Sequence, residues 1–285
     1  MTKSKPYYHK KRITTALLLA AGMGSRLAPL TQSAPKCLTM VNETCILDRL
    51  IASLNSHGFK RLVIVTGHLE DSIRNFLEDR AGDLVIEYVF SPRYKTTNNI
   101  YSLWMARNLI NEPFLLIESD LVFDPSLLKE MVYPDRIAVG SIKPWLNGST
   151  VTVNQSRRVD AFHSDTSETP LRTKYKTVNI YSFSLSSWRQ VVKVLNAHIR
   201  AGRVNDYYEV IFREMVAQKS LSLKAISFDG KPWYEIDTLE DLASAERLFP
   251  SKFSENLLFY NIDQNDDTHQ GNSNWGLKGQ AHAIA

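Results

Sequence analysis

Residues 17–36 read LLLAAGMGSRLAPLTQSAPK, and this segment determines how the rest of the chain is interpreted. Its apolar start is about as long as one buried strand. Gly22 and Gly24 follow, and they remove side chains where the amide groups of a loop would approach phosphate oxygens. Arg26 and Lys36 add two positive charges at fixed positions. The segment therefore predicts a buried strand that ends in a phosphate-binding loop.

This loop differs from the two most familiar glycine-rich phosphate motifs. A dinucleotide-binding fingerprint would have a third glycine where Leu27 stands, and a P-loop would end in Gly-Lys-Ser or Gly-Lys-Thr. Two glycines alone are weak evidence, but the register in which glycines, arginine, prolines, threonine and lysine follow one another is specific. The structural alternative is a strand, a turn and a helix with two incidental basic residues.

The overall composition is that of a globular protein. The chain has 285 residues, 44% of them hydrophobic, which suits one compact α/β domain with helices on both faces of a sheet. The formal net charge is +4, and much of the excess lies in the first dozen residues, so we expect a solvated basic arm and no nucleic-acid surface. Cys37 and Cys45 are too few for a disulfide framework and lack metal-ligand spacing, which predicts a cytoplasmic protein.

The basic arm and the apolar residues 16–21 together have some features of a signal peptide. The apolar run ends at Gly22, however, so it is shorter than most signal-peptide cores and far shorter than the roughly 20 residues of a membrane span. We therefore expect a buried first strand and no membrane insertion.

Apolar periodicity predicts that strands and helices alternate along the first half of the chain. Short apolar runs typical of strands buried on both faces lie at residues 16–19, 62–65, 84–89 and 114–117. Helical spacing lies between them, at residues 46–54, 73–77 and 100–109. Gly58 would end the first of these helices, and Asn98 or Asn99 would cap the third. This alternation predicts a Rossmann-like, doubly wound, mostly parallel sheet.

The pattern changes after Gly140. Short antiparallel strands are expected between residues 151 and 162, and a strand with alternating faces is expected over residues 175–183. Helices should follow at residues 186–199, 206–217 and 239–248. This half is predicted to be an antiparallel insert that binds the second substrate and packs on the same core. From Ser251 onward the chain is polar, and we expect it to be disordered.

Two acidic residues are candidates for a metal site. Asp120 follows the expected strand at residues 114–117, and the carboxyl ends of such strands border the ligand crevice. Asp237 ends the segment WYEID, just before the helix expected from Leu239. Mg²⁺ prefers one or two carboxylates together with phosphate oxygens and water. Asp237 has an alternative role, as the N-cap of that helix.

On these residues the sequence resembles the nucleotidyltransferases that activate sugar 1-phosphates and small alcohol phosphates. Their signature GxGxRLxPLTxxxPK is intact at residues 22–36. The resemblance implies that Lys36 contacts the phosphates beside the reacting bond and that Asp120 and Asp237 hold Mg²⁺. It also implies direct in-line transfer without a covalent enzyme intermediate, with Arg26, Lys36, Asp120 and Asp237 as the catalytic residues. The nucleotide-binding residues implied by this signature are Ala20, Ala21, Gly22, Met23, Gly24, Ser25, Arg26 and Lys36.

The segment NNIYSL, residues 98–103, narrows the resemblance to the branch that contains phosphocholine cytidylyltransferases and their relatives acting on 2-aminoethylphosphonate. The similarity extends from about Thr14 to Phe249. It implies CTP as the nucleotide, and it adds Asn98, Asn99 and Ser102 to the nucleotide site. The two asparagines either contact the pyrimidine or ribose, or cap a helix.

An acceptor with a cationic nitrogen would be held by aromatic rings and carboxylates. Lysines would hold its phosphate or phosphonate group. Candidate acceptor-binding residues are Trp145, Lys143, Lys176, Asn179, Tyr207, Glu209, Trp233 and Glu235, with Tyr208 and Tyr234 as further aromatic candidates. Residues 142–153 depart from the phosphocholine enzymes, which favours an aminoalkyl or hydroxyalkyl phosphonate over phosphocholine.

The resemblance also implies a division of the chain. Residues 1–12 form the basic arm, 13–250 the nucleotidyltransferase domain and 251–285 the polar tail. Within the domain, residues 13–140 would bind the nucleotide and residues 141–250 the acceptor. Two other functions stay open: a sugar 1-phosphate nucleotidyltransferase that makes an NDP-sugar, and an inactive nucleotide-binding regulatory homologue. The sequence also leaves the oligomeric state open, a homodimer included.

Overall fold

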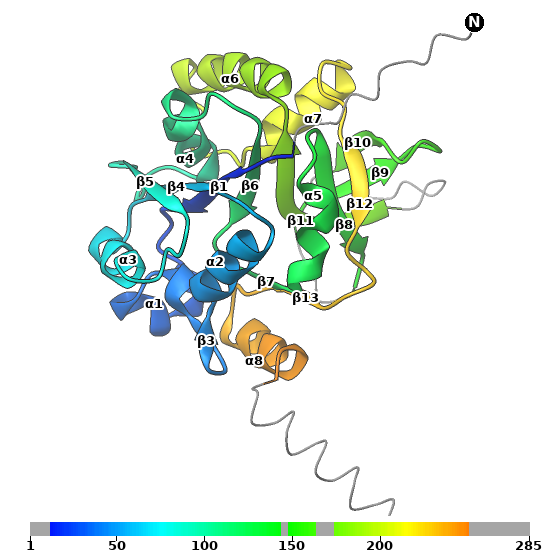
Figure 1. Ribbon diagram of the computed structural model, residues 1–285. Coiled ribbons are helices and arrows are strands. Elements are labelled where there is room, and N and C mark those ends of the chain that lie inside the picture. The colour runs from blue at the N-terminus through cyan, green and yellow to red at the C-terminus, as the bar shows by residue number, and fades with distance from the viewer. Residues whose placement is uncertain (1–11, 144–147, 164–173, 251–285) are drawn as a thin grey trace, which may run out of the picture. The chain divides into compact units, whose positions relative to one another are not determined.

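A nine-stranded sheet forms the centre of the computed structural model, which describes residues 12–143, 148–163 and 174–250. One half of the sheet is parallel and comes from the first half of the chain (Figure 1). β1 (Thr15–Ala20) pairs with β4 (Arg61–Thr66) on one side and with β6 (Phe114–Glu118) on the other, and β4 pairs with β5 (Val85–Phe90). All residues of β1 are buried, as expected for a central strand covered on both faces.

The other half of the sheet is mainly antiparallel. Its strands are β8 (Arg136–Ser141), β9 (Thr150–Val153), β10 (Val159–His163), β11 (Lys174–Phe183) and β12 (Lys224–Ser227). β11 joins the two halves, because its last residues pair antiparallel with β6 while its first residues pair with β9. The predicted doubly wound sheet with an antiparallel part is thereby confirmed.

The alternating pattern expected for β11 is wrong. Its residues 176–178 and 180–183 are buried in two continuous runs, since the strand lies inside the sheet and is covered on both faces. The register against β8 shifts between Thr177 and Tyr181, and Asn179 within this shift has a left-handed φ of 57°. The irregularity redirects the strand between its two partners.

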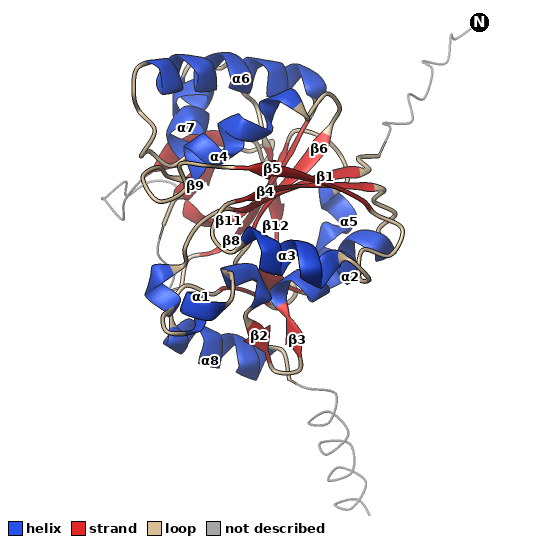
Figure 2. Cartoon of the chain, turned by 90° about the vertical axis from the view of Figure 1, so that its left-hand side faces the viewer, coloured by secondary structure: helices blue, strands red, loops and turns tan. Residues whose placement is uncertain are grey.

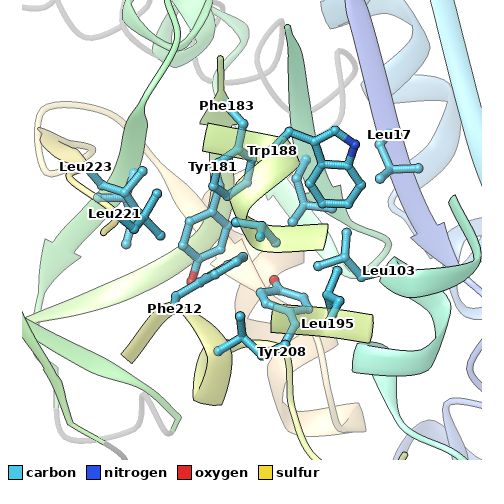
Figure 3. Packing of buried hydrophobic residues seen from close by; sticks show 14 of the residues in the cluster. Leu17, Leu103, Tyr181, Phe183, Trp188, Leu195, Tyr208, Phe212, Leu221 and Leu223 are labelled. Atoms are coloured by element: carbon cyan, nitrogen blue, oxygen red, sulfur yellow. The ribbon is translucent and has the colours of Figure 1, made fainter. Parts of the chain in front are cut away.

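Helices cover both faces of the sheet (Figure 2). α4 (Asn99–Met105), α6 (Leu185–Arg200) and α7 (Glu209–Ala217) lie on one face, and α2 (Ile46–Ser56), α3 (Glu70–Leu77) and α5 (Leu128–Met131) lie on the other. On the first face, Tyr181, Phe183 and Trp188 pack with Tyr208 and Phe212 in a buried aromatic cluster (Figure 3). These contacts attach α6 and α7 to the antiparallel half of the sheet.

Helix boundaries mostly agree with the sequence. α2 ends just before Gly58, whose φ of 76° is the left-handed conformation expected after a helix C-terminus. The side chain of Asn98 accepts a hydrogen bond from the amide of Asn99 and caps α4. α7 is the exception, because it begins at Glu209 and not at residue 206.

Within the described residues, four short 3-10 helices lie at Ser25–Leu27, Lys36–Leu38, Ala106–Asn108 and Pro125–Leu127. The remaining helices and strands are small. They are α1 (Leu30–Ser33), β2 (Met40–Val41), β3 (Thr44–Cys45), β7 (Leu121–Phe123), β13 (Trp233–Glu235) and α8 (Leu239–Leu248). β13 pairs antiparallel with β7, and the amide of Ile236 donates to the carbonyl of Asp120 at 2.9 Å. This pairing brings Asp237 beside Asp120, although 117 positions separate them in sequence. In the ranges described, none of the helices has the length and apolar character required to cross a membrane.

Candidate active site

Lys36 lies between the two acidic residues predicted to bind metal. Its Nζ atom donates to Asp120 Oδ2 at 2.9 Å and to Asp237 Oδ1 at 2.7 Å. Arg26 Nη2 donates to the same Asp237 oxygen at 2.8 Å. Burial lowers the pKa of Lys36, but the charges of Asp120 and Asp237 outweigh it, so the pKa is raised above its ordinary value. The amine of Lys36 is therefore an ammonium group at neutral pH.

The glycine loop packs directly over this lysine. Gly24 has a φ of 61°, and a Cβ atom on it would lie 3.0 Å from Thr31 Cγ2 and 3.3 Å from Lys36 Cβ. Thr31 Oγ1 also donates to the Gly24 carbonyl at 2.9 Å. Glycine is thus required at position 24 for two reasons: the left-handed backbone and the close approach of Thr31 and Lys36.

The loop, the lysine and the two aspartates open into one cavity of about 570 Å³. The cavity adjoins the carboxyl ends of β1 and β6, where ligands bind in open α/β sheets. Most of the residues predicted from sequence contribute to its lining. They are Ala21, Gly22, Gly24, Ser25, Arg26, Lys36, Asn98, Asn99, Ser102, Asp120, Lys176, Asn179, Tyr207, Glu209, Glu235 and Asp237.

Three glutamates border the same cavity. Burial, followed by the charges of Asp120 and Glu209, raises the pKa of Glu118 well above its usual range. Burial raises the pKa of Glu209 to about 7, although the charge of Lys176 opposes this shift. Burial also raises the pKa of Glu235, again against the charge of Lys176. Burial on this wall of the cavity therefore favours the protonated, neutral forms of all three carboxyl groups.

Two of these glutamates accept hydrogen bonds from other side chains. Lys176, which is 2% exposed, donates from Nζ to Glu235 Oε2 at 3.0 Å and to its neighbour's carbonyl, Thr177 O, at 2.8 Å. Asn179 Nδ2 donates to Glu235 Oε1 at 3.1 Å, and Asn99 Nδ2 donates to Glu118 Oε1 at 3.2 Å. Glu209 differs, because its Oε2 atom is buried and has no hydrogen-bond partner among the described residues.

This combination of fold and site agrees with a known family. The sequence model of the nucleotidyl transferase family matches residues 15–251. The chain belongs to this family. The resemblance found in the signature at residues 22–36 is thus confirmed over most of the chain.

Several characterised proteins resemble this nucleotidyl transferase. CMP-5'-(3-aminopropyl)phosphonate synthase of Streptomyces rubellomurinus is 28% identical over 258 residues, which cover 85% of this chain but only 40% of the synthase. 2-Aminoethylphosphonate cytidylyltransferase of Lancefieldella rimae is 24% identical, with 81% of this chain and 91% of that protein covered. The structure of CTP:phosphocholine cytidylyltransferase from Streptococcus pneumoniae superposes with a TM-score of 0.73 at 20% identity, covering 84% and 100% of the two chains. This last match shows a shared fold.

The structure gives Asn98 and Asn99 roles within the protein. Asn98 caps α4, one of the two alternatives drawn from the sequence. The side chain of Asn99 accepts from the amide of Tyr208 at 3.0 Å and donates to Glu118, so it connects α4 to β6 and to the start of α7. Both residues also line the cavity of this nucleotidyl transferase.

Asp237 does not cap α8. Thr238 is the N-cap, because its hydroxyl accepts from the amide of Asp241 at 3.2 Å while the Asp241 carboxylate accepts from the amide of Thr238 at 2.9 Å. The carboxylate of Asp237 is therefore available to face Lys36 and Arg26.

Some predicted site residues lie elsewhere. Trp233 belongs to the core and packs so closely on Gly140 that a Cβ there would lie 2.6 Å from its ring, because β13 directs this side chain onto the sheet. Tyr208 and Tyr234 are likewise buried in core clusters. Ala20, Met23 and Lys143 are described but are not part of the cavity lining. Trp145 lies outside the described residues.

The sequence analysis missed Glu118, His163 and Arg213 of the cavity lining, and also Tyr94, Thr97, Ser119 and Ser149. Glu118 ends β6, two residues before Asp120, and this position at a strand's carboxyl end was a usable signal. Arg213 follows Glu209 by one helical turn on α7, but only the structure shows that this face of α7 borders the cavity. His163 ends β10 and had no signal in its local sequence.

Proposed function

We propose that this nucleotidyl transferase moves CMP from CTP onto a small phosphonate or phosphate-ester acceptor and releases pyrophosphate. The observation that carries the proposal is the contact of Lys36 with both Asp120 and Asp237, directly beneath the glycine loop and inside one cavity. Two similar proteins, the 3-aminopropylphosphonate and 2-aminoethylphosphonate enzymes, support CMP transfer and this class of acceptor.

In this proposal the glycine loop and the two basic residues bind the triphosphate. Gly22 and Gly24 let backbone amides approach phosphate oxygens, and the charges of Arg26 and Lys36 stabilise the negative charge that develops on the leaving pyrophosphate. Because the pKa of Lys36 is raised, its ammonium acts as a charge and not as a general base.

Asp120 and Asp237 would hold Mg²⁺. Both direct one carboxylate oxygen at a single cation, the Lys36 ammonium, and Asp120 Oδ1 is buried with no partner among the described residues. No group of three His, Cys, Asp or Glu side chains in the described ranges is arranged to hold a metal ion, so the other ligands would be phosphate oxygens and water, as Mg²⁺ prefers. When bound, Mg²⁺ would neutralise triphosphate charge.

The transfer would be a direct in-line displacement. An acceptor phosphonate or phosphate oxygen is already ionised at neutral pH, so it attacks the α-phosphorus of CTP without a protein base. A new bond forms between that oxygen and phosphorus, and the bond to the bridging oxygen of pyrophosphate breaks. The residues of this site would act by positioning the two substrates and by stabilising charge.

The acceptor would occupy the part of the cavity formed by the antiparallel half of the protein. Lys176, Asn179, Tyr207, Glu209 and Glu235 line this part, and they come from β11, β13 and α7 with the segment before it. We accordingly propose residues 13–140 as the main nucleotide-binding half and residues 141–250 as the main acceptor-binding half.

The deciding experiment measures pyrophosphate release with Mg²⁺. Each of the four common nucleoside triphosphates is combined with phosphocholine, 2-aminoethylphosphonate, 2-hydroxyethylphosphonate and glucose 1-phosphate. Release with CTP and one of the first three acceptors is the expected result. Release with glucose 1-phosphate and another triphosphate would replace the proposal with NDP-sugar synthesis. No release with any pair, from a protein that binds CTP, would favour a regulatory homologue.

A further inference from the structure

We propose that Glu209 receives the nitrogen of the acceptor and that this nitrogen is a primary ammonium, not a quaternary one. This inference rests on the proposed function and specifies the acceptor more narrowly. It starts from a difference in hydrogen bonding among the three glutamates of the cavity. Glu118 and Glu235 accept from amide or lysine side chains, whereas Glu209 Oε2 is buried and has no donor among the described residues. Because Glu209 lines the cavity, a ligand bound there can supply the missing donor, and a cationic N–H group is the strongest donor for a carboxylate.

The position of Glu209 on α7 supports this reading. It is the first residue of the helix, where a negative charge is favoured by the helix dipole. A purely structural role at this end would be met by a solvated carboxylate. Glu209 instead lines the cavity, and burial raises its pKa to about 7 although the Lys176 charge opposes this shift, so the charged form is costly in the ligand-free protein. An ammonium group beside it would remove that cost.

The choice between primary and quaternary nitrogen follows from hydrogen-bond donors. A primary ammonium has three N–H groups, so it can satisfy Glu209 Oε2 directly. A trimethylammonium group has none and would leave that oxygen without a partner. Proteins bind quaternary nitrogen mainly through several aromatic faces that surround it.

Tyr181, Tyr208 and Trp233 do not contribute to such an enclosure. Tyr181 and Tyr208 lie 5.8 Å apart in an edge-on contact within the buried cluster of Figure 3, and neither lines the cavity. Trp233 is in the core. Tyr94, Phe162 and Tyr207 do line the cavity, but Phe162 packs in the core cluster and Tyr207 is 59% exposed. Within the described ranges, the acceptor half of the lining thus contains Glu209 and Glu235 together with Phe162 and Tyr207.

The test compares three acceptors of related size with CTP and Mg²⁺: 2-aminoethylphosphonate, its N,N,N-trimethyl derivative and propylphosphonate, in which a methyl group replaces the amine. We expect kcat/KM to be at least tenfold higher for the primary amine than for either other compound. In Glu209→Gln the ratio of kcat/KM for 2-aminoethylphosphonate to kcat/KM for propylphosphonate should fall by about 10- to 100-fold. The change should be mainly in KM, as expected for the loss of a charged hydrogen bond.

Glu214→Gln is the matched control, because Glu214 lies on the same helix but contacts His198 and is not part of the cavity lining. This control should keep the wild-type ratio. Equal use of the trimethyl derivative would overturn the inference. So would a Glu209→Gln variant, shown to be folded by circular dichroism, whose ratio is unchanged.

The two proposals fail in different ways. Absence of pyrophosphate release with all three acceptors and CTP would count against CMP transfer to phosphonates. Calorimetric titration with Mg²⁺ and a non-hydrolysable CTP analogue then tests the amine site alone. Binding of 2-aminoethylphosphonate but not of the trimethyl derivative, lost in Glu209→Gln, would support the inference. Equal binding of both compounds, or of neither, would overturn it.

Discussion

The two halves of the cavity balance their charges in different ways. In the nucleotide half, Asp120 and Asp237 are paired with Lys36, and Asp237 is paired also with Arg26. In the acceptor half, Glu209 keeps a buried oxygen without a partner. In the nucleotide half the carboxylates are thus paired with cations of the protein, although Asp120 Oδ1 also lacks a partner among the described residues, whereas no described cation forms an ion pair with Glu209. Substitutions in the two halves should have correspondingly different effects.

The largest effect is expected in the nucleotide half, from Asp120→Asn. The change removes a carboxylate that would hold Mg²⁺ and that pairs with Lys36, so we expect kcat to fall by about three orders of magnitude with the fold retained. Pyrophosphate release and circular dichroism measure the two quantities. Asp83→Asn is the control, since that side chain is 85% exposed. Near-normal turnover of Asp120→Asn would exclude this residue from the metal site.

Lys36→Ala should have the next largest effect. The variant loses the charge proposed to contact the triphosphate and leaves Asp120 and Asp237 without the ammonium that separates them. We expect kcat/KM for CTP to fall by about 100-fold, with changes in both kcat and KM. Lys60→Ala, at a lysine whose side chain is 64% exposed, should be unaffected. If only KM changed, the role of Lys36 would be limited to binding.

In the acceptor half, Glu209→Gln should stabilise the ligand-free protein at pH 8 but not at pH 4. Burial raises the pKa of Glu209 from 4.5 to about 7. Below 4.5 the carboxyl is protonated in both folded and unfolded states and has no charge to bury. Between 4.5 and 7 the unfolded state releases its proton first, so stability falls, and above 7 the loss is complete at up to about 3 kcal/mol.

Urea denaturation of wild type and Glu209→Gln at the two pH values measures this difference. The other titrating groups are common to both proteins, so the comparison isolates Glu209. An equal effect of the substitution at both pH values would mean that the charge of Glu209 is not costly. The contrast between the two halves would then be lost.

The smallest effect is expected for Gly24→Ala in the glycine loop. Alanine is strained at a φ of 61°, and its Cβ would lie 3.0 Å from Thr31 Cγ2, so we expect a loss of about 1–2 kcal/mol in the free energy of unfolding and weaker CTP binding. Gly22→Ala is the informative comparison, because nothing lies within 4 Å of its added Cβ. If Gly22→Ala weakens CTP binding without loss of stability, the two glycines have separate roles.

Local sequence was most informative where the site residues are close together in the chain. The apolar run before Gly22 predicted β1, the helical spacing predicted α2 with its end near Gly58, and Asn98 was identified as a cap. The alternating faces expected of β11 were wrong, because covering elements on both sides of a sheet override a two-residue pattern. The start of α7 was placed three residues early, at a boundary with no clear capping residue.

The sequence alone determined the phosphate loop, the strand that carries it and the candidate aspartates, since these depend on residue types at short, fixed spacing. The tertiary structure decided which distant residues meet. The pairing of β13 with β7 places Asp237 beside Asp120, and the packing of α7 against β11 places Glu209 at the cavity while Trp233 goes to the core. Contacts of this kind depend on long-range packing. The local sequence around a Trp or a Glu does not show whether its side chain will lie in the core or at the cavity.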